Sequence, residues 1–302
     1  MNAAIFSLLP VRRGTTIVSV RIGRWLSDLL GVPLLDNGDI SSLGALDVLF
    51  IVNGSTLYCK HLEALAQAVR AARQVVWVQN DYTLPPPKAA SDALSPFRRA
   101  FADRALVPHY WTTCEDNAAA TEKSAWVNWN SLGFLMNAAG AALDSDSVLY
   151  YGAYRPGRAS SFQAMYDAFA GGSLIISSTS ENFPEKNRVP PFREDLLKSI
   201  SEYGMGVYIQ DEKTSKGRHS PATRFYEMLS VRLPMCFTPD CASTLLRYGY
   251  DVAPYVFHGK EDAQALLRDR RNVSLCQQKD WAEDFESRVA SQVRSLYAQL
   301  DC

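Results

Sequence analysis

Short apolar runs alternate along the chain with longer segments in which apolar residues recur every three or four positions. The first pattern is typical of buried β-strands and the second of amphipathic helices. In the first half, strands are expected at Ala3–Leu9, Val32–Leu35, Asp47–Val52, Val75–Val78 and Leu106–Thr112, and helices at Val20–Leu30 and His61–Ala72. Gly31 is expected to end the first helix, and Pro33 confines the second strand to a sheet edge.

The same alternation continues through the second half of the chain. Strands are expected at Val148–Tyr151, Leu174–Ser177, Val207–Gln210 and Met235–Thr238, and helices at Ser160–Phe169, Leu196–Tyr203, Ala242–Tyr248, Asp262–Arg268 and Lys279–Leu300. The small and polar segment Ala138–Ser147 is interpreted as a linker. Because strands that alternate with helices form parallel sheets, the predicted fold class is α/β with two Rossmann-like domains.

One stretch, Lys216–Pro234, joins a loop of small and basic residues to a helix. Ser220 and Pro221 are typical of a helix start, where free N–H groups and the helix dipole favour phosphate. Arg224 can add charge-assisted bonds to a diphosphate, and Glu227 shares its helix face and can accept bonds from two ribose hydroxyls. The alternative is an ordinary amphipathic helix, with Arg224 and Glu227 as a solvated pair.

A second candidate is the loop that follows the first strand of the second half. Gly152 and Gly157 let the backbone approach a ligand, and Arg155 and Arg158, on either side of the turn after Tyr154, can meet phosphate oxygens. The order of residues in a P-loop or a GxGxxG dinucleotide site is absent. The alternative is a strand-to-helix turn with surface arginines.

Further polar residues lie near the ends of predicted strands, where open α/β sheets bind ligands. Ser178 and Gln210 each lie at such an end, and His219 lies beside Ser220, where it can touch a diphosphate. Asp81 follows a strand of the first half and can deprotonate an acceptor hydroxyl in an inverting enzyme, or position the acceptor in a retaining one. Turns and plain strand ends are the alternative for these positions.

The formal net charge of −1 excludes a basic field over the whole protein, so nucleic-acid binding requires a local patch. Arginines in the first half could form such a patch beside aromatic residues, with phosphate contacts and base stacking. The candidates are Arg12, Arg13, Arg21, Arg24, Arg98, Arg99 and Arg104, with Tyr110, Trp126 and Trp129. Solvated helix faces and core aromatics are the alternative.

Two kinds of segment are not expected. No apolar run approaches the ~20 residues of a membrane span, and the N-terminus lacks the positive region of a signal peptide. The six cysteines form no Cys-x-x-Cys pair and only four histidines are present, so no metal site is predicted. A reducing, cytoplasmic compartment is the default for such scattered cysteines.

Two segments resemble a known family. Arg224, Glu227 and the run Val231–Pro234 resemble the donor-site helix of GT-B glycosyltransferases, in which a basic residue and a Glu precede a small or apolar run ending in Pro. The loop Tyr151–Arg155, with its Tyr-Gly-x-Tyr-Arg pattern, resembles the loop after the first donor-domain strand in phage enzymes that glycosylate hydroxymethylated pyrimidines in DNA.

The resemblance implies two domains that face a cleft. Residues 1–143 would form an acceptor-binding domain, residues 144–279 a nucleotide-sugar-binding domain, and residues 280–302 a helix that packs back on the first domain. The donor substrate would be a UDP-sugar, expected as UDP-glucose, with no tightly bound cofactor. The resemblance places Gln210 at the nucleotide base. Asp81, Arg155 and Arg224 are the expected catalytic residues.

The implied acceptor is a hydroxymethylated pyrimidine of phage DNA, which makes DNA a partner and the host cytoplasm the compartment. Two other functions remain open. One is a glycosyltransferase acting on a small molecule or a surface glycan, and the other is a non-catalytic, two-lobed binding protein. Salt-sensitive DNA binding distinguishes the two enzymes, and stabilisation by nucleoside diphosphates distinguishes both from the binding protein. The oligomeric state is not predicted.

Overall fold

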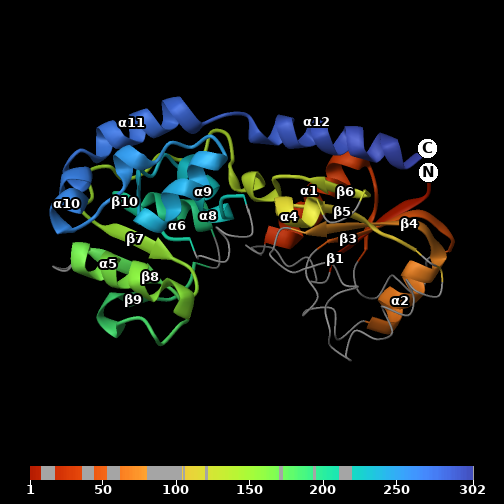
Figure 1. The fold of residues 1–302 in the computed structure, drawn as a ribbon, viewed down its shortest axis with the longest axis horizontal. Helices are drawn as coiled ribbons and strands as arrows, with labels where there is room; N and C mark the ends of the chain where they lie inside the picture. The colour runs from red at the N-terminus through yellow and green to blue at the C-terminus, as the bar shows by residue number, and fades with distance from the viewer. Residues whose placement is uncertain are drawn as a thin grey trace. The chain divides into compact units, whose positions relative to one another are not determined.

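The computed structural model describes residues 1–7, 18–35, 44–52, 62–79, 104, 106–119, 122–169, 173–192, 195–210 and 220–301. The chain divides into two compact units (Figure 1): unit 1 is Met1–Asn130 with Glu286–Cys302, and unit 2 is Ser131–Phe285. Each unit contains one sheet of parallel strands, which confirms the α/β class with two Rossmann-like domains. Among the described helices, none has the length and apolar composition needed to span a bilayer.

The sheet of unit 1 has six strands in the order β2-β1-β3-β4-β5-β6. The strands are β1 (Ala3–Ser7), β2 (Leu34–Leu35), β3 (Leu46–Val52), β4 (Ala72–Gln79), β5 (His109–Thr112) and β6 (Ser124–Trp126). The helices are α1 (Val18–Leu30), α2 (Leu62–Ala71), α4 (Glu115–Ala118) and α12 (Phe285–Ala298). As predicted, β2 lies at the sheet edge, and Gly31 follows α1 with a φ of 65°.

Side chains alternate between the two faces of this sheet, and both faces are covered. One face forms a core cluster with α2, whose members include Phe6, Ile51, Trp77, Tyr110 and Val69. On the opposite face, the ring of Phe50 lies 5.8 Å from the ring of Tyr297 in α12. In addition, Gln292 Nε2 of this helix donates to the Trp126 carbonyl at 2.6 Å. Helix α12 therefore covers the sheet whose strands lie between Ala3 and Trp126.

The prediction of a single terminal helix over Lys279–Leu300 is wrong. The structure has α11 (Arg270–Trp281), an extended residue at Ala282 with ψ of 124°, and then α12. Asp284 immediately precedes α12, a position where Asp stabilises a helix start. The side chains of Trp281 and Phe285, on either side of the break, are both buried in one aromatic cluster of unit 2.

The sheet of unit 2 has five strands in the order β11-β10-β7-β8-β9. The strands are β7 (Val148–Tyr151), β8 (Leu174–Ser177), β9 (Arg188–Val189), β10 (Met205–Tyr208) and β11 (Met235–Phe237). The helices besides α11 are α5 (Ala159–Phe169), α6 (Leu196–Ser201), α8 (Thr223–Ser230), α9 (Ala242–Arg247) and α10 (Lys260–Arg268). The short strand β9 was not predicted because its two residues form no apolar run.

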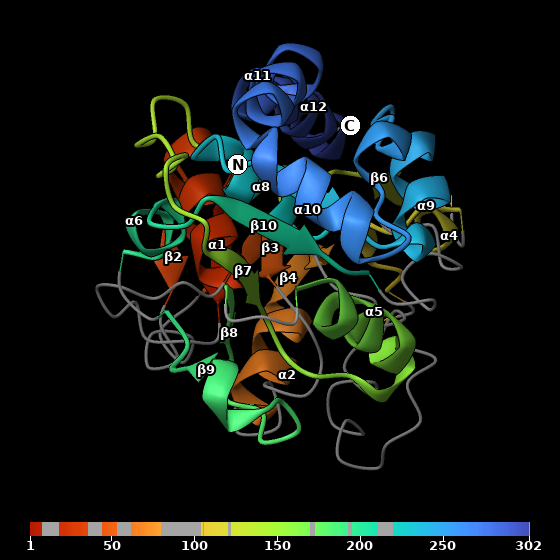
Figure 2. The ribbon, with the colours of Figure 1, turned by 90° about the vertical axis from the view of Figure 1, so that its left-hand side faces the viewer.

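Helices cover both faces of the unit 2 sheet (Figure 2). α5 and α10 pack against one face, while α6, α8, α9 and α11 contribute to the core on the other. Gly206 in β10 lies where α8 comes closest, because a Cβ there would lie 2.3 Å from Met228 Sδ. The missing side chain thus sets how closely α8 approaches the sheet.

Helix α8 begins two residues later than the sequence predicts. Ser220 was expected as the N-cap and Pro221 as the first helical residue, but the N-cap is Ala222, with no side-chain bond to the cap. The Ala222 N–H instead donates to Tyr208 Oη at 2.8 Å. This tertiary bond holds Ala222 extended, with φ −64° and ψ 152°, and it takes the place of a local serine cap.

The strand order of unit 2 places a switch point between β7 and β10. From β7 the chain moves outward in one direction to β8 and β9, and then crosses to β10 on the other side of β7. Open α/β sheets bind ligands at such a point.

The segment Ala138–Ser147, interpreted from the sequence as a linker, lies in unit 2 and is bonded to it. The Ala142 N–H donates to the Ser201 carbonyl at 2.7 Å, and the Gly204 N–H donates to the Ser147 carbonyl at 3.0 Å. A Cβ on Gly204 would lie 1.8 Å from the Ser145 carbonyl oxygen. The segment therefore passes directly over the start of β10.

Gly204→Ala is expected to destabilise unit 2, because the methyl group would overlap a backbone oxygen that cannot rotate away. The expected loss is about 1–3 kcal/mol in the free energy of unfolding, measured by denaturant titration. Gly140→Ala is the matched control, because a Cβ at Gly140 meets no atom within 4 Å. Equal stability of the two variants would contradict the close approach of this segment.

Candidate functional site

The switch point of unit 2 gathers polar side chains from three elements. Gly152 is the first residue after β7, and Gln210 is the second residue after β10. Arg224 and Glu227 project from the first two turns of α8. Sequence reasoning placed all four at a ligand. The structure brings them to the carboxyl ends of two adjacent strands.

The guanidinium of Arg224 is held above these strand ends. Its Nη2 donates to the Ile209 carbonyl at 2.5 Å. The guanidinium carbon lies 5.7 Å from the ring centroid of Tyr150 in β7 and 5.4 Å from that of Tyr208 in β10. Because each ring face is electron-rich, both attract the cation.

Among the described residues, the positive charge of Arg224 is not neutralised by a carboxylate. Its side chain is half-buried, and its Nε is enclosed without a hydrogen-bond acceptor. Within the described part of the chain, no carboxylate forms an ion pair with it. Burial acts to lower the pKa of Arg224, but the combined effect of Tyr150, Tyr208, Tyr151 and Cys241 acts in the opposite direction and the net shift is upward, so the group stays charged.

Gly152 makes room for this arginine. Its φ is 139°, a conformation that residues with a side chain rarely adopt, and a Cβ would lie 2.8 Å from Arg224 Nη1. In this structure the backbone at Gly152 approaches the guanidinium of Arg224, and its approach to a ligand stays a prediction.

Arg158 lies near the same point. It ends the short 3₁₀ turn Pro156–Arg158 and is 7% exposed. Burial raises the pKa of Tyr208, and Arg224 and Arg158 both act in the opposite direction by favouring the phenolate. Arg158 is therefore close enough to Tyr208 to act on its pKa together with Arg224.

The other residues of this loop have different surroundings. Tyr154 stacks on Phe162, with ring centroids 5.1 Å apart and an interplanar angle of 22°, and meets Phe183 edge-on. It helps to fix the loop to α5. The Arg155 side chain is exposed at the start of the 3₁₀ turn, and its contact with phosphate stays a prediction.

Glu227 is buried, with 4% of its surface exposed, so it is not the solvated residue of an ordinary amphipathic helix. Tyr151 Oη lies 3.0 Å from Glu227 Oε2 and donates to it, and it lies 3.3 Å from the carbonyl oxygen of Arg224. On the other side, a Cβ on Gly133 would lie 3.3 Å from Glu227 Cγ and 2.7 Å from Thr223 Cγ2. The carboxylate is therefore held between the end of β7 and the segment around Gly133.

Gln210 continues β10 and is 2% exposed. Its Oε1 accepts a bond from Tyr208 Oη at 3.3 Å, while its Nε2 is enclosed and has no acceptor among the described residues. Ser220, the first described residue after position 210, is 1% exposed. An enclosed amide nitrogen without a partner is costly in a folded protein, by about 1–3 kcal/mol.

Other predicted site residues have local roles or lie outside the described ranges. Ser178 Oγ accepts a hydrogen bond from the N–H of Ser180 at 3.1 Å, so Ser178 forms a turn, as the alternative interpretation expects. Its contact with a ligand stays a prediction. Asp81 and His219 lie outside the described residues, as do Arg12, Arg13, Arg98 and Arg99.

Two described residues of the expected basic patch, Arg104 and Trp129, have structural roles. Arg104 Nη1 donates to the carbonyls of Val69, Arg70 and Ala72 at the end of α2, where a cation stabilises a helix. Trp129 is fully buried, with its Nε1 donating to the Trp111 carbonyl at 2.9 Å. Trp129 is therefore a core aromatic residue, as the alternative interpretation expects, and it cannot stack on a base.

Sequence reasoning missed the tyrosines that organise the site. Tyr150 and Tyr208 hold Arg224, and Tyr151 holds Glu227. Each lies at or next to the last position of an apolar strand that points to the carboxyl edge. An aromatic hydroxyl at that position is the one signal that could have marked them.

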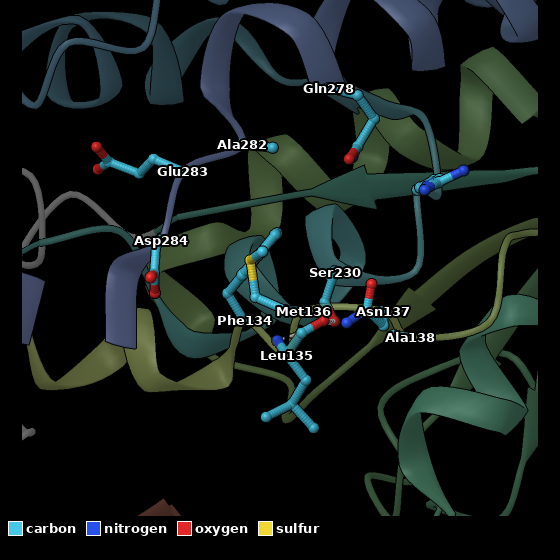
Figure 3. Close-up of a pocket in the computed structure, with 11 residues that line it drawn as sticks. Phe134, Leu135, Met136, Asn137, Ala138, Ser230, Gln278, Ala282, Glu283 and Asp284 are labelled. Carbon is cyan, nitrogen blue, oxygen red and sulfur yellow. Dashed lines mark hydrogen bonds between the residues drawn. The ribbon is translucent and has the colours of Figure 1, made fainter. Parts of the chain in front are cut away.

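The described part of unit 2 also contains a pocket of about 360 Å³, at the end of α8 opposite to Arg224 (Figure 3). It is lined by Phe134, Leu135, Met136, Asn137, Ala138, Ser230, Arg232, Gln278, Ala282, Glu283 and Asp284. The Leu135 N–H donates to Ser230 Oγ at 3.0 Å, and Ser230 Oγ donates to the Leu135 carbonyl at 2.9 Å. None of the predicted ligand-binding residues lines it.

No protein-family model matches the chain, and no curated protein matches it either. No group of three or more His, Cys, Asp or Glu side chains that could hold a metal ion occurs within the described ranges. The arrangement at the switch point supports binding of an anion, because it combines two arginines, a backbone approach and buried hydrogen-bond donors.

Tyr166 in α5 provides a test of the packing beside this site. Its hydroxyl is enclosed with no acceptor within the described residues. Burial, with added effects of Tyr154 and Tyr150, raises the pKa of Tyr166 from 10.0 to about 12. The folded protein therefore keeps this proton where the unfolded chain loses it, so stability is full below about pH 10 and falls as the pH rises.

Tyr166→Phe is expected to raise the free energy of unfolding near neutral pH by about 1 kcal/mol, because it removes an unsatisfied hydroxyl. It should also make the alkaline loss of stability shallower. Denaturant titrations at a series of pH values, with the wild type in parallel, measure both effects. A less stable variant with an unchanged alkaline slope would show that this hydroxyl has a partner.

Proposed function

We propose that unit 2 binds a nucleotide sugar at the carboxyl ends of β7 and β10, and that the protein is a GT-B-type glycosyltransferase. The observation that carries the proposal is Arg224, a charged, half-buried guanidinium at the switch point of a parallel sheet. A cation out of water is unfavourable unless an anion meets it. A diphosphate would supply that charge and would accept bonds from several donors at once.

The surroundings of Arg224 fit a diphosphate ligand. Arg158 adds a second positive charge beside Tyr208, and Gly152 lets the backbone come close. Arg155 lies on the same loop with an exposed side chain, and we assign it a contact with the bound phosphate. In this proposal, these groups stabilise the negative charge that develops on the leaving diphosphate during sugar transfer.

Glu227 fits the sugar part of the nucleotide. Its carboxylate accepts a bond from Tyr151, and a carboxylate is a group that can accept bonds from ribose hydroxyls. It lies one helical turn from Arg224, so one ligand can reach both residues. We assign the ribose to Glu227 and the diphosphate to Arg224, Arg158 and Gly152.

The acceptor is assigned by this proposal to unit 1, with Asp81 as the group that deprotonates or positions its hydroxyl. The sequence resemblance favours a hydroxymethylated pyrimidine in phage DNA as acceptor and UDP-glucose as donor. Such a role places the protein in the cytoplasm of the host cell. Nucleotide-sugar binding without any transfer would instead support a two-lobed binding protein.

Arg224→Gln is expected to weaken UDP binding by about 10- to 150-fold, since a hydrogen bond to a charged group contributes about 1.5–3 kcal/mol. Binding by the wild type should weaken with added salt, and the variant should respond less. Isothermal titration calorimetry with UDP measures both effects. Arg271→Gln, which removes an exposed arginine on α11, is the matched control and should bind as the wild type does.

If no nucleoside diphosphate binds the wild type, the proposed donor site is wrong. If UDP binds equally well to the wild type and to Arg224→Gln, nucleotide binding occurs elsewhere in the chain. The Arg271→Gln control separates both outcomes from a general change in protein charge.

The proposed reaction predicts that duplex DNA containing hydroxymethylpyrimidines gains one hexose per modified base when incubated with the protein and UDP-glucose. Mass spectrometry of the digested DNA measures this, with a panel of other sugar nucleotides in parallel. Unmodified DNA should gain nothing, and Arg224→Gln should transfer far more slowly. Transfer to small glycans but not to this DNA would identify the other class of acceptor.

A further inference from the structure

The pocket at the end of α8 has walls that are fixed by packing and by hydrogen bonds. Phe134, one of its lining residues, belongs to the buried aromatic cluster of unit 2. Ser230 Oγ binds both the N–H and the carbonyl of Leu135. On the α11 side, Gln278 Nε2 donates to the Leu229 carbonyl at 2.7 Å and joins α11 to α8. The shape of the pocket is therefore set before any ligand arrives.

Two lining residues adopt a backbone conformation that is unfavourable for most side chains. Among the described residues, three other than glycine have a positive φ, and two of them, Asn137 at 64° and Arg232 at 59°, line this pocket. Asparagine tolerates the conformation, whereas arginine adopts it at a cost that glycine would avoid. Because residues held in such conformations cluster at functional sites, they mark this pocket for a role in binding.

The pocket also exposes apolar side chains. Leu135 is 47% exposed and Met136 is 59% exposed, although the backbone of Leu135 is held by Ser230. The Met136 side chain extends toward Ala282, at the break between α11 and α12 (Figure 3). A ligand that covers these side chains gains roughly fourfold in affinity for each methylene group that it buries.

The charges around the pocket favour a cation. Its lining includes the exposed carboxylates Glu283 and Asp284 and one exposed cation, Arg232. The carboxyl ends of α8 and α11 both lie at the pocket, and a helix dipole attracts positive charge to that end. The amino end of α12 acts in the opposite direction, and Asp284 directly before it offsets that contribution.

The pocket lies beside both points at which the chain passes from one unit to the other. Unit 2 begins at Ser131 and ends at Phe285. Residues 134–138 line the pocket shortly after the first of these points, and residues 282–284 line it just before the second. A ligand in the pocket would therefore contact the segment that enters unit 2 and the segment that leaves it.

We propose that this pocket binds a small organic cation with an apolar body, and that the bound ligand joins residues 134–138 to residues 282–284. The volume of about 360 Å³ lies near the lower end of the range of about 300–1,000 Å³ for small-molecule sites, so the ligand is compact. Its apolar body covers Leu135 and Met136, and its charge lies toward Asp284 and the two helix ends. The site shares no residue with the proposed nucleotide site.

Methyl NMR of the full chain, with ¹³C in the methionine methyl groups, tests the proposal with hexylammonium as the probe. The Met136 resonance, assigned with Met136→Leu, should shift and saturate. The resonance of Met165, which is buried in α5, should not shift. Hexylammonium should bind more tightly than butylammonium by about 10- to 20-fold, because it buries two more methylene groups. It should also bind more tightly than hexanol, and hexanol more tightly than hexanoate.

Two variants test the sign of the charge. Asp284→Asn keeps a residue suited to a helix start and should weaken hexylammonium binding by roughly 1.5- to 5-fold, with hexanol binding unchanged. Arg232→Gly removes a like charge and should strengthen hexylammonium binding. Leu246→Ser is the matched control, because Leu246 is an exposed apolar residue of α9 that does not line the pocket. Its affinities should equal those of the wild type.

Amide hydrogen exchange with bound hexylammonium should slow both in residues 134–138 and in residues 282–284. Slowing in one segment alone, or a Met136 resonance that does not saturate, would overturn the proposal. Tighter binding of hexanoate than of hexylammonium would overturn it too, because the ligand would not be a cation. Equal shifts of Met136 and Met165 would show non-specific solvation. A Met136 shift that depends on protein concentration alone would show that a second copy covers the pocket, and either result would contradict the assigned site.

Discussion

The candidate site of unit 2 depends on one charged contact, the guanidinium of Arg224 over the ends of two parallel strands. It lies against the rings of Tyr150 and Tyr208 and is bonded to the Ile209 carbonyl, so a single side chain joins α8, β7 and β10. The missing side chain of Gly152 gives it space. The same contact that orders the protein also leaves positive charge available at the place where parallel sheets bind ligands.

Much of the fold could be predicted because it is specified by local patterns. The strands β3 and β7 are continuous apolar runs, which is how strands covered on both faces appear in a sequence. The errors occurred where local signals were weak. The break after Trp281 contains neither Gly nor Pro, and β9 has two residues, so neither left a pattern to find.

The site was only partly predictable. Residues with obvious chemistry, such as Arg224 and Glu227, could be selected because their spacing on a helix places them together. The start of α8 could not be predicted, because a hydrogen bond from the Ala222 N–H to Tyr208 Oη replaces the serine cap that the local sequence favours. The role of Tyr151 was hidden for the same reason, since its partner lies 76 positions away in the chain. Hydrogen bonds between distant residues leave no periodic trace in a sequence.

The division of the chain has a consequence for how the protein emerges from the ribosome. Unit 2 is one continuous segment, whereas unit 1 needs residues from both ends of the chain. The sheet of unit 1 is synthesised before unit 2, but the helix that covers one of its faces, with Tyr297 against Phe50, is synthesised after unit 2. Because domains fold as units during synthesis, the apolar face around Phe50 stays uncovered until unit 2 has been synthesised, and unit 2 can complete its core earlier.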